Sequence, residues 1–272
     1  MSTMTMDQPA TIDQASEQPI LAEAAERLET APPQEILRWA VQRYRSAGST
    51  QAGRGGISLA CSFGMQSVVI IHMLHDLGLL DDVQVFYLDT GVLFNETHQT
   101  RLRTQNKYGF EAVRVAAALS WQDQQREYGG HLYERGAEGI STCCYLRKVE
   151  PMRRYFQRVQ PAAWITGIRR SHNATRQTVP VTLWDQANGL AKINPVAAMD
   201  DATLWGYIKA HDVPYNPLYD QGYSSIGCDT PVCTARPDGE DGRSGRWAGT
   251  TKTECGIHVD GAVIKSMDSS SL

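Results

Sequence analysis

The segment that most constrains the fold is GISLACSFGMQSVVIIHMLHDLG, residues 56–78. It predicts a buried strand over 57–61, a short polar loop, and an apolar helix that ends near Gly78. A second apolar run, VQVFYLDTG, precedes a polar helix around NETHQTRLRTQNKYG, and AAWITGIRR predicts a third strand. Strands that alternate with helices are typical of a parallel sheet covered on both faces. The sequence therefore predicts an α/β fold with a mostly parallel central sheet.

The rest of the sequence predicts one domain between an N-terminal arm and a C-terminal tail. Residues 1–30 contain few large apolar side chains, which predicts a disordered arm. PPQEILRWAVQRY predicts a helix with Pro33 at its first position, and DDATLWGYIKAHDV predicts a capped amphipathic helix. We therefore expect a domain over 31–240 and a mobile C-terminal tail over 241–272.

Composition and charge exclude several classes of protein. The chain has 272 residues, of which 42% are hydrophobic and 21% charged, as in ordinary globular proteins. Its net charge of −4 provides no general attraction to nucleic acid or to an anionic membrane. No apolar run approaches the roughly 18 residues of a membrane span, and the N-terminus lacks the pattern of a signal peptide. We expect a cytoplasmic protein whose six cysteines stay reduced and serve metal binding or catalysis.

Two loops that follow predicted strands are candidates for a nucleotide site. In SFGMQS, Ser62 and Ser67 offer hydroxyl groups, Gly64 permits close backbone approach, and the following helix directs its positive end towards the loop. The second strand ends in LDTG, so Asp89 and Thr90 fall on the same rim of a parallel sheet. The loop lacks the GK[ST] of a Walker sequence, and a tight turn with polar residues is the alternative interpretation.

Six motifs in order reveal a family resemblance: SFGMQS, YLDTG followed by LFNET, KVEPM, WITGIRR, YNPLYDQGYSSIG and ECGIH. Together they span about residues 33–258, and the chain resembles the sulfonucleotide reductases. That family reduces adenylyl sulfate, or its 3′-phosphorylated form, to sulfite. The resemblance implies an adenine nucleotide alpha-hydrolase-like fold related to the ATP pyrophosphatases.

The resemblance also implies a role for two pairs of cysteines. Family members with a Cys-Cys pair and a later pair bind a four-iron, four-sulfur cluster and generally use adenylyl sulfate. Here Cys143 and Cys144 are the first pair, and Cys228 and Cys233 are the second. Adjacent helical residues diverge by about 100°, so both thiols of a vicinal pair reach one cluster only if the helix is irregular there. We therefore expect a kinked or irregular turn at the first pair.

The second pair departs from the family pattern. The family has Cys-x-x-Cys, whereas Cys228 and Cys233 are separated by four residues that include Pro231. The wider spacing requires a differently folded loop, and a zinc site or free thiols remain alternatives to the cluster. Cys61 stands apart, because its place at the end of an apolar strand predicts a small buried hydrophobic residue.

Cys255 in ECGIH corresponds to the catalytic nucleophile of the family. The resemblance implies attack of its thiolate on the sulfate sulfur, release of AMP and an S-sulfocysteine on the enzyme. Thioredoxin or a related dithiol protein then releases sulfite from that adduct. His258 is expected to tune or position the tail.

An anionic substrate and a thiolate together require positive charge. The candidates are Lys148, Arg169, Arg170, Arg243 and Arg246, which lie beside the motifs in three segments. Guanidinium groups can bind phosphate or sulfate oxygens with two hydrogen bonds, and nearby cations lower the pKa of a thiol. Each of them alone would ordinarily be a solvated surface residue.

Several functions remain open at this stage. A thioredoxin-dependent adenylyl-sulfate reductase is the leading hypothesis. Gln66 in the SFGMQS loop favours the 3′-phosphorylated substrate instead, and a dual activity is a further alternative. An ATP pyrophosphatase, an adenylyl transferase and a non-catalytic metalloprotein are the rivals from other classes. The oligomeric state, including a homo-oligomer, is left open.

Overall fold

A computed structural model describes residues 12–47, 56–172, 174–234, 246–247, 250, 252 and 254–258. In this part of the chain six strands form one sheet, in the order β3-β2-β1-β4-β6-β5. The strands are β1 Ile57–Ala60, β2 Gln84–Asp89, β3 Val113–Ala116, β4 Ala163–Ile165, β5 Thr182–Asp185 and β6 Leu190–Ile193. All neighbouring strands pair in parallel except β5 with β6, which are antiparallel. The predicted mostly parallel sheet is confirmed.

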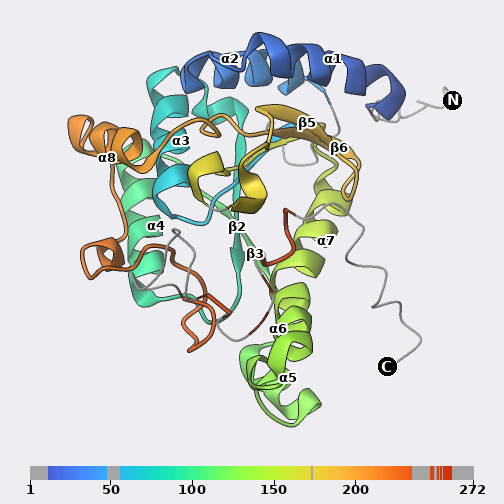
Figure 1. The fold of residues 1–272 in the computed structure, drawn as a ribbon, viewed down its shortest axis with the longest axis vertical. Coiled ribbons are helices and arrows are strands. Elements are labelled where there is room, and N and C mark those ends of the chain that lie inside the picture. The colour runs from blue at the N-terminus through green and yellow to red at the C-terminus, as the bar shows by residue number, and fades with distance from the viewer. Residues whose placement is uncertain are drawn as a thin grey trace, which may run out of the picture.

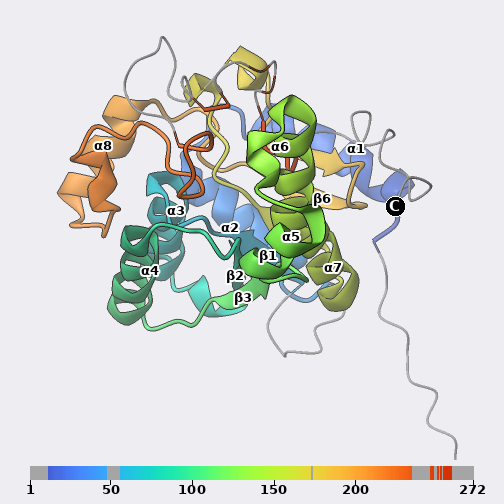
Figure 2. The ribbon, with the colours of Figure 1, turned by 90° about the horizontal axis from the view of Figure 1, so that it is seen from below.

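Helices cover both faces of this sheet (Figures 1 and 2). They are α1 Gln14–Arg27, α2 Pro33–Tyr44, α3 Met65–Asp76, α4 Asn95–Tyr108, α5 Trp121–Tyr128, α6 Gly136–Cys144, α7 Glu150–Val159 and α8 Asp201–Ala210. Successive β2 residues alternate between the two faces: Val85 joins the large core under α1, α2, α3 and α8, while Phe86 packs with Met152 of α7. None of the described helices is both long and apolar enough to cross a membrane.

Strands β3, β5 and β6 are not predicted from the sequence. Each has only four residues, and a charged residue (Arg114, Asp185 or Lys192) interrupts or ends the apolar run that such a short strand needs in order to be recognised. β5 and β6 are joined by a turn in which the Asp185 carboxylate accepts hydrogen bonds from the backbone N–H groups of Ala187 and Asn188. Their antiparallel pairing depends on this turn and on β4, to which β6 pairs.

The expected disordered arm over 1–30 is wrong for α1. Asp13 caps this helix by accepting from the Ser16 N–H, and Leu21 is only 1% exposed. The Thr182 hydroxyl of β5 donates to the Leu21 carbonyl over 2.7 Å, and Arg43 of α2 forms a two-point ion pair with Glu17. A few buried side chains thus hold α1 against β5 and α2, although the average composition of this segment resembles that of a disordered chain. Residues 1–11 lie outside the described part of the chain.

Candidate functional site

A cavity of about 190 Å³ opens at the carboxyl ends of β1, β2 and β4. β1 has β2 on one side and β4 on the other, so the strand order reverses there, as is typical of ligand sites in open α/β sheets. Of the predicted site residues, the cavity is lined by Ser62, Gly64, Ser67, Thr90, Lys148, Arg246, Cys255 and His258. The predicted rim therefore forms, with side chains contributed by segments far apart in the sequence.

The SFGMQS loop presents the start of α3 to this cavity. Gly64 is the N-cap of α3 and has no side chain with which to cap its first turn, where the Met65 N–H donates to the Tyr219 hydroxyl. Ser67 donates its hydroxyl to the Gly64 carbonyl over 3.0 Å, and Ser62 accepts from the Gly64 N–H over 3.4 Å. Phe63 is held at a φ of 54°, a left-handed conformation that non-glycine residues rarely adopt. A helix start beside the two serine hydroxyl groups is a suitable binding place for an anion.

Asp89 and Thr90 lie on the rim but face different neighbours. Asp89 accepts from the Gly91 N–H over 2.9 Å and from Arg114 Nε over 2.6 Å, and it is not part of the cavity lining. Burial alone would raise the pKa of the Asp89 carboxyl, but these hydrogen bonds hold that pKa below its usual value. The Thr90 hydroxyl lines the cavity and accepts from the Cys228 thiol over 3.4 Å. Asp89 therefore shapes the turn, whereas Thr90 reaches the site.

The cysteines of the two predicted pairs come together beside the cavity. Cys143 and Cys144 end α6, and the helical chain becomes a π-helical turn at Tyr145–Val149, so the irregular turn expected at the pair lies directly after it. Cys143 is half-buried next to Gln124, whose amide nitrogen is 3.9 Å from the sulfur. A buried cluster near this turn contains Ile140, Cys144, Cys228, Cys233, Trp247 and Cys255.

A tight turn accommodates the wider spacing of the second pair. The Cys233 N–H donates to the Thr230 carbonyl over 3.2 Å, with Pro231 at the second position of the turn that this bond closes. The Asp229 N–H donates to the Val92 carbonyl over 2.7 Å and anchors the loop next to β2. A hydrogen bond from Cys233, with Lys148 nearby, lowers the pKa of Cys228 despite its burial. The two additional residues are thus absorbed while both sulfurs stay in the cluster.

The chemistry of the donor set is compatible with an iron-sulfur group. Among the described residues, no three His, Cys, Asp or Glu side chains are arranged to hold one metal ion. Zinc would require its ligands within about 2.3 Å of one centre, so the zinc alternative gains no support. Four cysteine sulfurs in and beside one buried cluster, close to cations, are the ligand type and number that a four-iron cluster requires.

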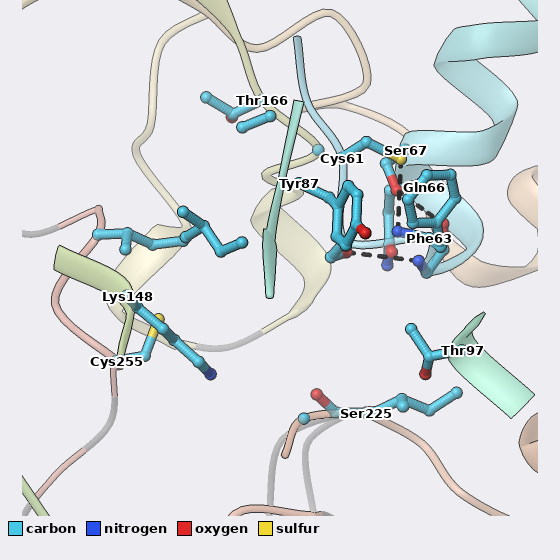
Figure 3. Close-up of a pocket in the computed structure, with 18 of the residues that line it drawn as sticks. Cys61, Phe63, Gln66, Ser67, Tyr87, Thr97, Lys148, Thr166, Ser225 and Cys255 are labelled. Atoms are coloured by element: carbon cyan, nitrogen blue, oxygen red, sulfur yellow. Dashed lines mark hydrogen bonds between the residues drawn. The ribbon is translucent and has the colours of Figure 1, made fainter. Parts of the chain in front are cut away.

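Two of the predicted cations reach the cavity. Lys148 is half-buried beside Cys255 at one side of it, while Phe63, Gln66 and Ser67 lie at the other (Figure 3). Burial alone would lower the pKa of the Lys148 ammonium, but the nearby cysteine sulfurs raise it. Arg246 donates from Nη1 to the Ser225 hydroxyl over 3.1 Å.

Arg169 and Arg170 are not brought into the cavity lining. Arg169 is 1% exposed and donates to Asp201 over 2.7 Å, and in the amide orientation of Gln66 that satisfies both groups its Nε also donates to Gln66. Arg170 forms an ion pair with Glu29 and donates to the Val179 carbonyl. Acceptors within the protein thus engage both guanidinium groups. The remaining predicted cation, Arg243, lies outside the described residues.

The segment that carries Cys255 is folded into the cavity. Cys255 is 8% exposed, and His258 stacks on Trp164 of β4 with ring centroids 5.7 Å apart. Gly256 has a φ of +99°, and a Cβ at this position would lie 3.1 Å from a Val149 methyl group. Most of the predicted tail over 241–272 lies outside the described residues, but 254–258 belong to the site.

Comparison with known proteins agrees with this geometry. Residues 56–234 match the model of the phosphoadenosine phosphosulfate reductase domain. The adenosine 5′-phosphosulfate reductase of Rhodococcus opacus (strain B4) is 39% identical, over 88% of this chain and 94% of that protein. The chain belongs to the sulfonucleotide reductase family. A phosphoadenosine 5′-phosphosulfate reductase of this family, from Gloeobacter violaceus, is 37% identical, over 94% of this chain and 99% of that protein.

A solved structure extends the family likeness to the fold. The phosphoadenylyl-sulfate reductase of Candida auris, in a phosphate complex, superimposes with a TM-score of 0.64 at 26% identity. The match covers 81% of this chain and 98% of that structure. The adenine nucleotide alpha-hydrolase-like fold is thereby confirmed.

Several residues of the reductase site are not predicted from the sequence. Thr166 and Gly167 follow β4 and line the cavity, and their position at a strand's carboxyl end is a signal that could have identified them. Arg176 lines it from a short 3-10 turn that carries no recognisable motif. Arg147, next to Lys148, is 2% exposed and donates to the Gln124 side chain over 2.7 Å and to the Ser120 carbonyl over 2.8 Å.

Proposed function

We propose that this chain reduces adenylyl sulfate to sulfite and AMP in sulfate assimilation, with Cys255 as the nucleophile. The placement of Cys255 carries the proposal: its thiol lines the cavity beside Lys148, with the start of α3 across the same cavity. A nucleotide between them would present its phosphate and sulfate groups to a thiol, a lysine and a helix N-terminus. The relative from Rhodococcus opacus is named for this substrate.

The first step transfers the sulfur group to the protein. The Cys255 thiolate attacks the sulfate sulfur, a sulfur–sulfur bond forms, and the bond from that sulfur to the phosphate oxygen breaks. AMP leaves with the electron pair, and the protein retains an S-sulfocysteine. Lys148 and Arg246 stabilise the anionic groups, and the ammonium of Lys148 favours the thiolate.

The second step returns the thiol. A thiolate of thioredoxin, or of a related dithiol protein, attacks the Cys255 sulfur and releases sulfite, which leaves a mixed disulfide. The second thiol of the partner resolves that disulfide, so the partner is oxidised by two electrons and Cys255 is regenerated. Because both proteins need reduced thiols, we place the reaction in the cytoplasm.

We assign a four-iron, four-sulfur cluster to Cys143, Cys144, Cys228 and Cys233. These residues do not line the cavity, whereas Cys255 does, which separates four ligands from one nucleophile. When bound, the cluster supplies structure and electrostatic influence near the substrate. Lys148 lines the cavity and interacts electrostatically with Cys144 and Cys228, so it connects the two parts of the site.

The test is retention of label from adenylyl [³⁵S]sulfate by protein without reductant. We expect label on the peptide that contains Cys255, and its release as sulfite when thioredoxin is added. The Cys255→Ser variant should retain none while its circular dichroism spectrum matches the wild type. A wild-type protein that never acquires label on Cys255 would refute the proposal.

The 3′-phosphorylated nucleotide is the second candidate substrate. The relative from Gloeobacter violaceus is named for it, and Gln66 lines the cavity. Rates of sulfite release from both nucleotides, measured at equal concentration, decide between them. A tenfold preference for the 3′-phosphorylated form would reverse our choice of substrate.

A further inference from the structure

A buried ion pair joins the segment of Cys255 to the body of the domain. Arg176 donates from Nε to Glu254 Oε1 over 2.6 Å and from Nη2 to Oε2 over 2.8 Å. The two side chains are 8% and 11% exposed. This two-point geometry fixes the carboxylate in orientation as well as in distance.

The pair differs from the other ion pairs between described residues. In each of those, at least one side chain is about one third or more exposed, as in the pair of Arg170 with Glu29. Exposed pairs contribute little, whereas removal of one partner from a buried pair leaves an uncompensated charge. Loss of the Arg176–Glu254 ion pair should therefore have a large effect on the position of the segment that carries Cys255.

The position of this pair next to the thiol gives it a specific consequence. Glu254 immediately precedes Cys255, and His258 on the other side stacks on Trp164. The segment is thus anchored on both sides of a thiol that is 8% exposed. Such a thiol can meet a small ligand in the cavity, but a protein reductant cannot approach it without movement of the segment.

We infer that Arg176 is a positioning residue for Cys255: its ion pair with Glu254 holds the thiol in the cavity for attack, and opening of the pair exposes the sulfur to the protein reductant. The inference rests on the proposed function, because it assigns the two arrangements of the segment to the two displacement steps. Arg176 acts through Glu254 and takes no part in bond making or breaking.

The first test measures the rate at which iodoacetamide modifies Cys255 in nucleotide-free, cluster-loaded protein. Glu254→Gln removes the charge of the pair, and we expect modification at least tenfold faster than in the wild type. Glu29→Gln is the matched control, since it removes the same charge from the exposed pair with Arg170, and its rate should stay within twofold. Equal rates for Glu254→Gln and the wild type would overturn the inference.

The second test separates the two displacements. In Glu254→Gln, formation of the labelled adduct should slow at least tenfold, while thioredoxin should release sulfite from preformed adduct at the wild-type rate or faster. Slowing of both steps together would indicate a general structural defect and would overturn the inference. If Glu254→Gln does not fold, Glu254→Asp, which keeps the charge and shortens the reach, gives the same comparison. Failure of the proposed function differs from failure of this inference. In the first case wild-type protein would acquire no label from the nucleotide, whereas in the second Glu254→Gln and the wild type would react with iodoacetamide at equal rates.

Discussion

At the scale of single residues, the thiols differ because their surroundings differ. Cys61 is buried at the end of β1, and that burial raises its pKa to about 12. Cys228 is also buried, but a hydrogen bond from Cys233 and the charge of Lys148 lower its pKa. Burial therefore does not by itself determine the pKa of a thiol, since a hydrogen bond and a nearby cation reverse its effect at Cys228.

The raised pKa of Cys61 predicts an inert thiol. At pH 8, a pKa of about 12 leaves a thiolate fraction of about 10⁻⁴. We expect iodoacetamide to leave Cys61 unmodified in the native protein and to modify it fully after denaturation in guanidinium chloride. Peptide mass spectrometry measures both. Rapid modification of Cys61 in the native state would contradict the burial seen here.

At the scale of elements, α6 places the vicinal cysteines through close backbone packing. A Cβ on Gly139 would lie 2.2 Å from the Leu132 carbonyl oxygen, so only glycine allows α6 to approach the turn before it. After Cys144 the chain widens into a π-helical turn, a feature that often marks functional sites. The position of both thiols thus depends on one small residue and one irregular turn.

Two helical glycines provide a matched comparison of this packing. Gly139→Ala should lower the free energy of unfolding by about 1–3 kcal/mol, because the added methyl group meets backbone that cannot move independently. Gly206→Ala in α8 has no atom within 4 Å of the new Cβ, and its better helix propensity should raise that free energy by up to about 1 kcal/mol. Urea denaturation measures both variants. Equal effects would show that α6 is not closely packed.

At the scale of the whole molecule, the domain begins at α1 rather than at α2. α1 lies along β5, and its buried side chains join the core shared with α2, α3 and α8 (Figure 1). Glu17 of α1 is ion-paired with Arg43 of α2, and the buried Tyr44 hydroxyl donates a hydrogen bond to the same carboxylate. A chain lacking this helix would expose apolar surface of the sheet.

Neighbouring residues of α1 test whether it belongs to the domain. Leu21 is 1% exposed, so Leu21→Ala should lower the free energy of unfolding by about 2–5 kcal/mol. Ile20 is 36% exposed, and Ile20→Ala should change the free energy of unfolding by no more than about 0.5 kcal/mol. Chemical denaturation at one pH compares the two. If the segment were a disordered arm, both variants would match the wild type.

Much of the rim was predictable because it depends on short stretches of chain. Ser62, Gly64, Ser67 and Thr90 were identified from loops that follow apolar runs, and the structure places all of them in the cavity lining. β3, β5, β6 and α1 are not predicted, because the apolar residues in these segments are few or interrupted and form a weak pattern until other elements pack against them. The cations were predicted as a group, and the structure brings only some of them to the cavity.

The sequence by itself determined the alternation of strands and helices, the loops that meet at the sheet's edge, the cysteine pairs and the motif around Cys255. Hydrophobic periodicity and motif spacing are properties of consecutive residues, so they can be recognised without a fold. Only the tertiary structure decided which charges meet: Arg170 pairs with Glu29, 141 positions away, and Arg176 with Glu254, 78 positions away. Such contacts depend on how the whole chain packs, and no local pattern encodes them.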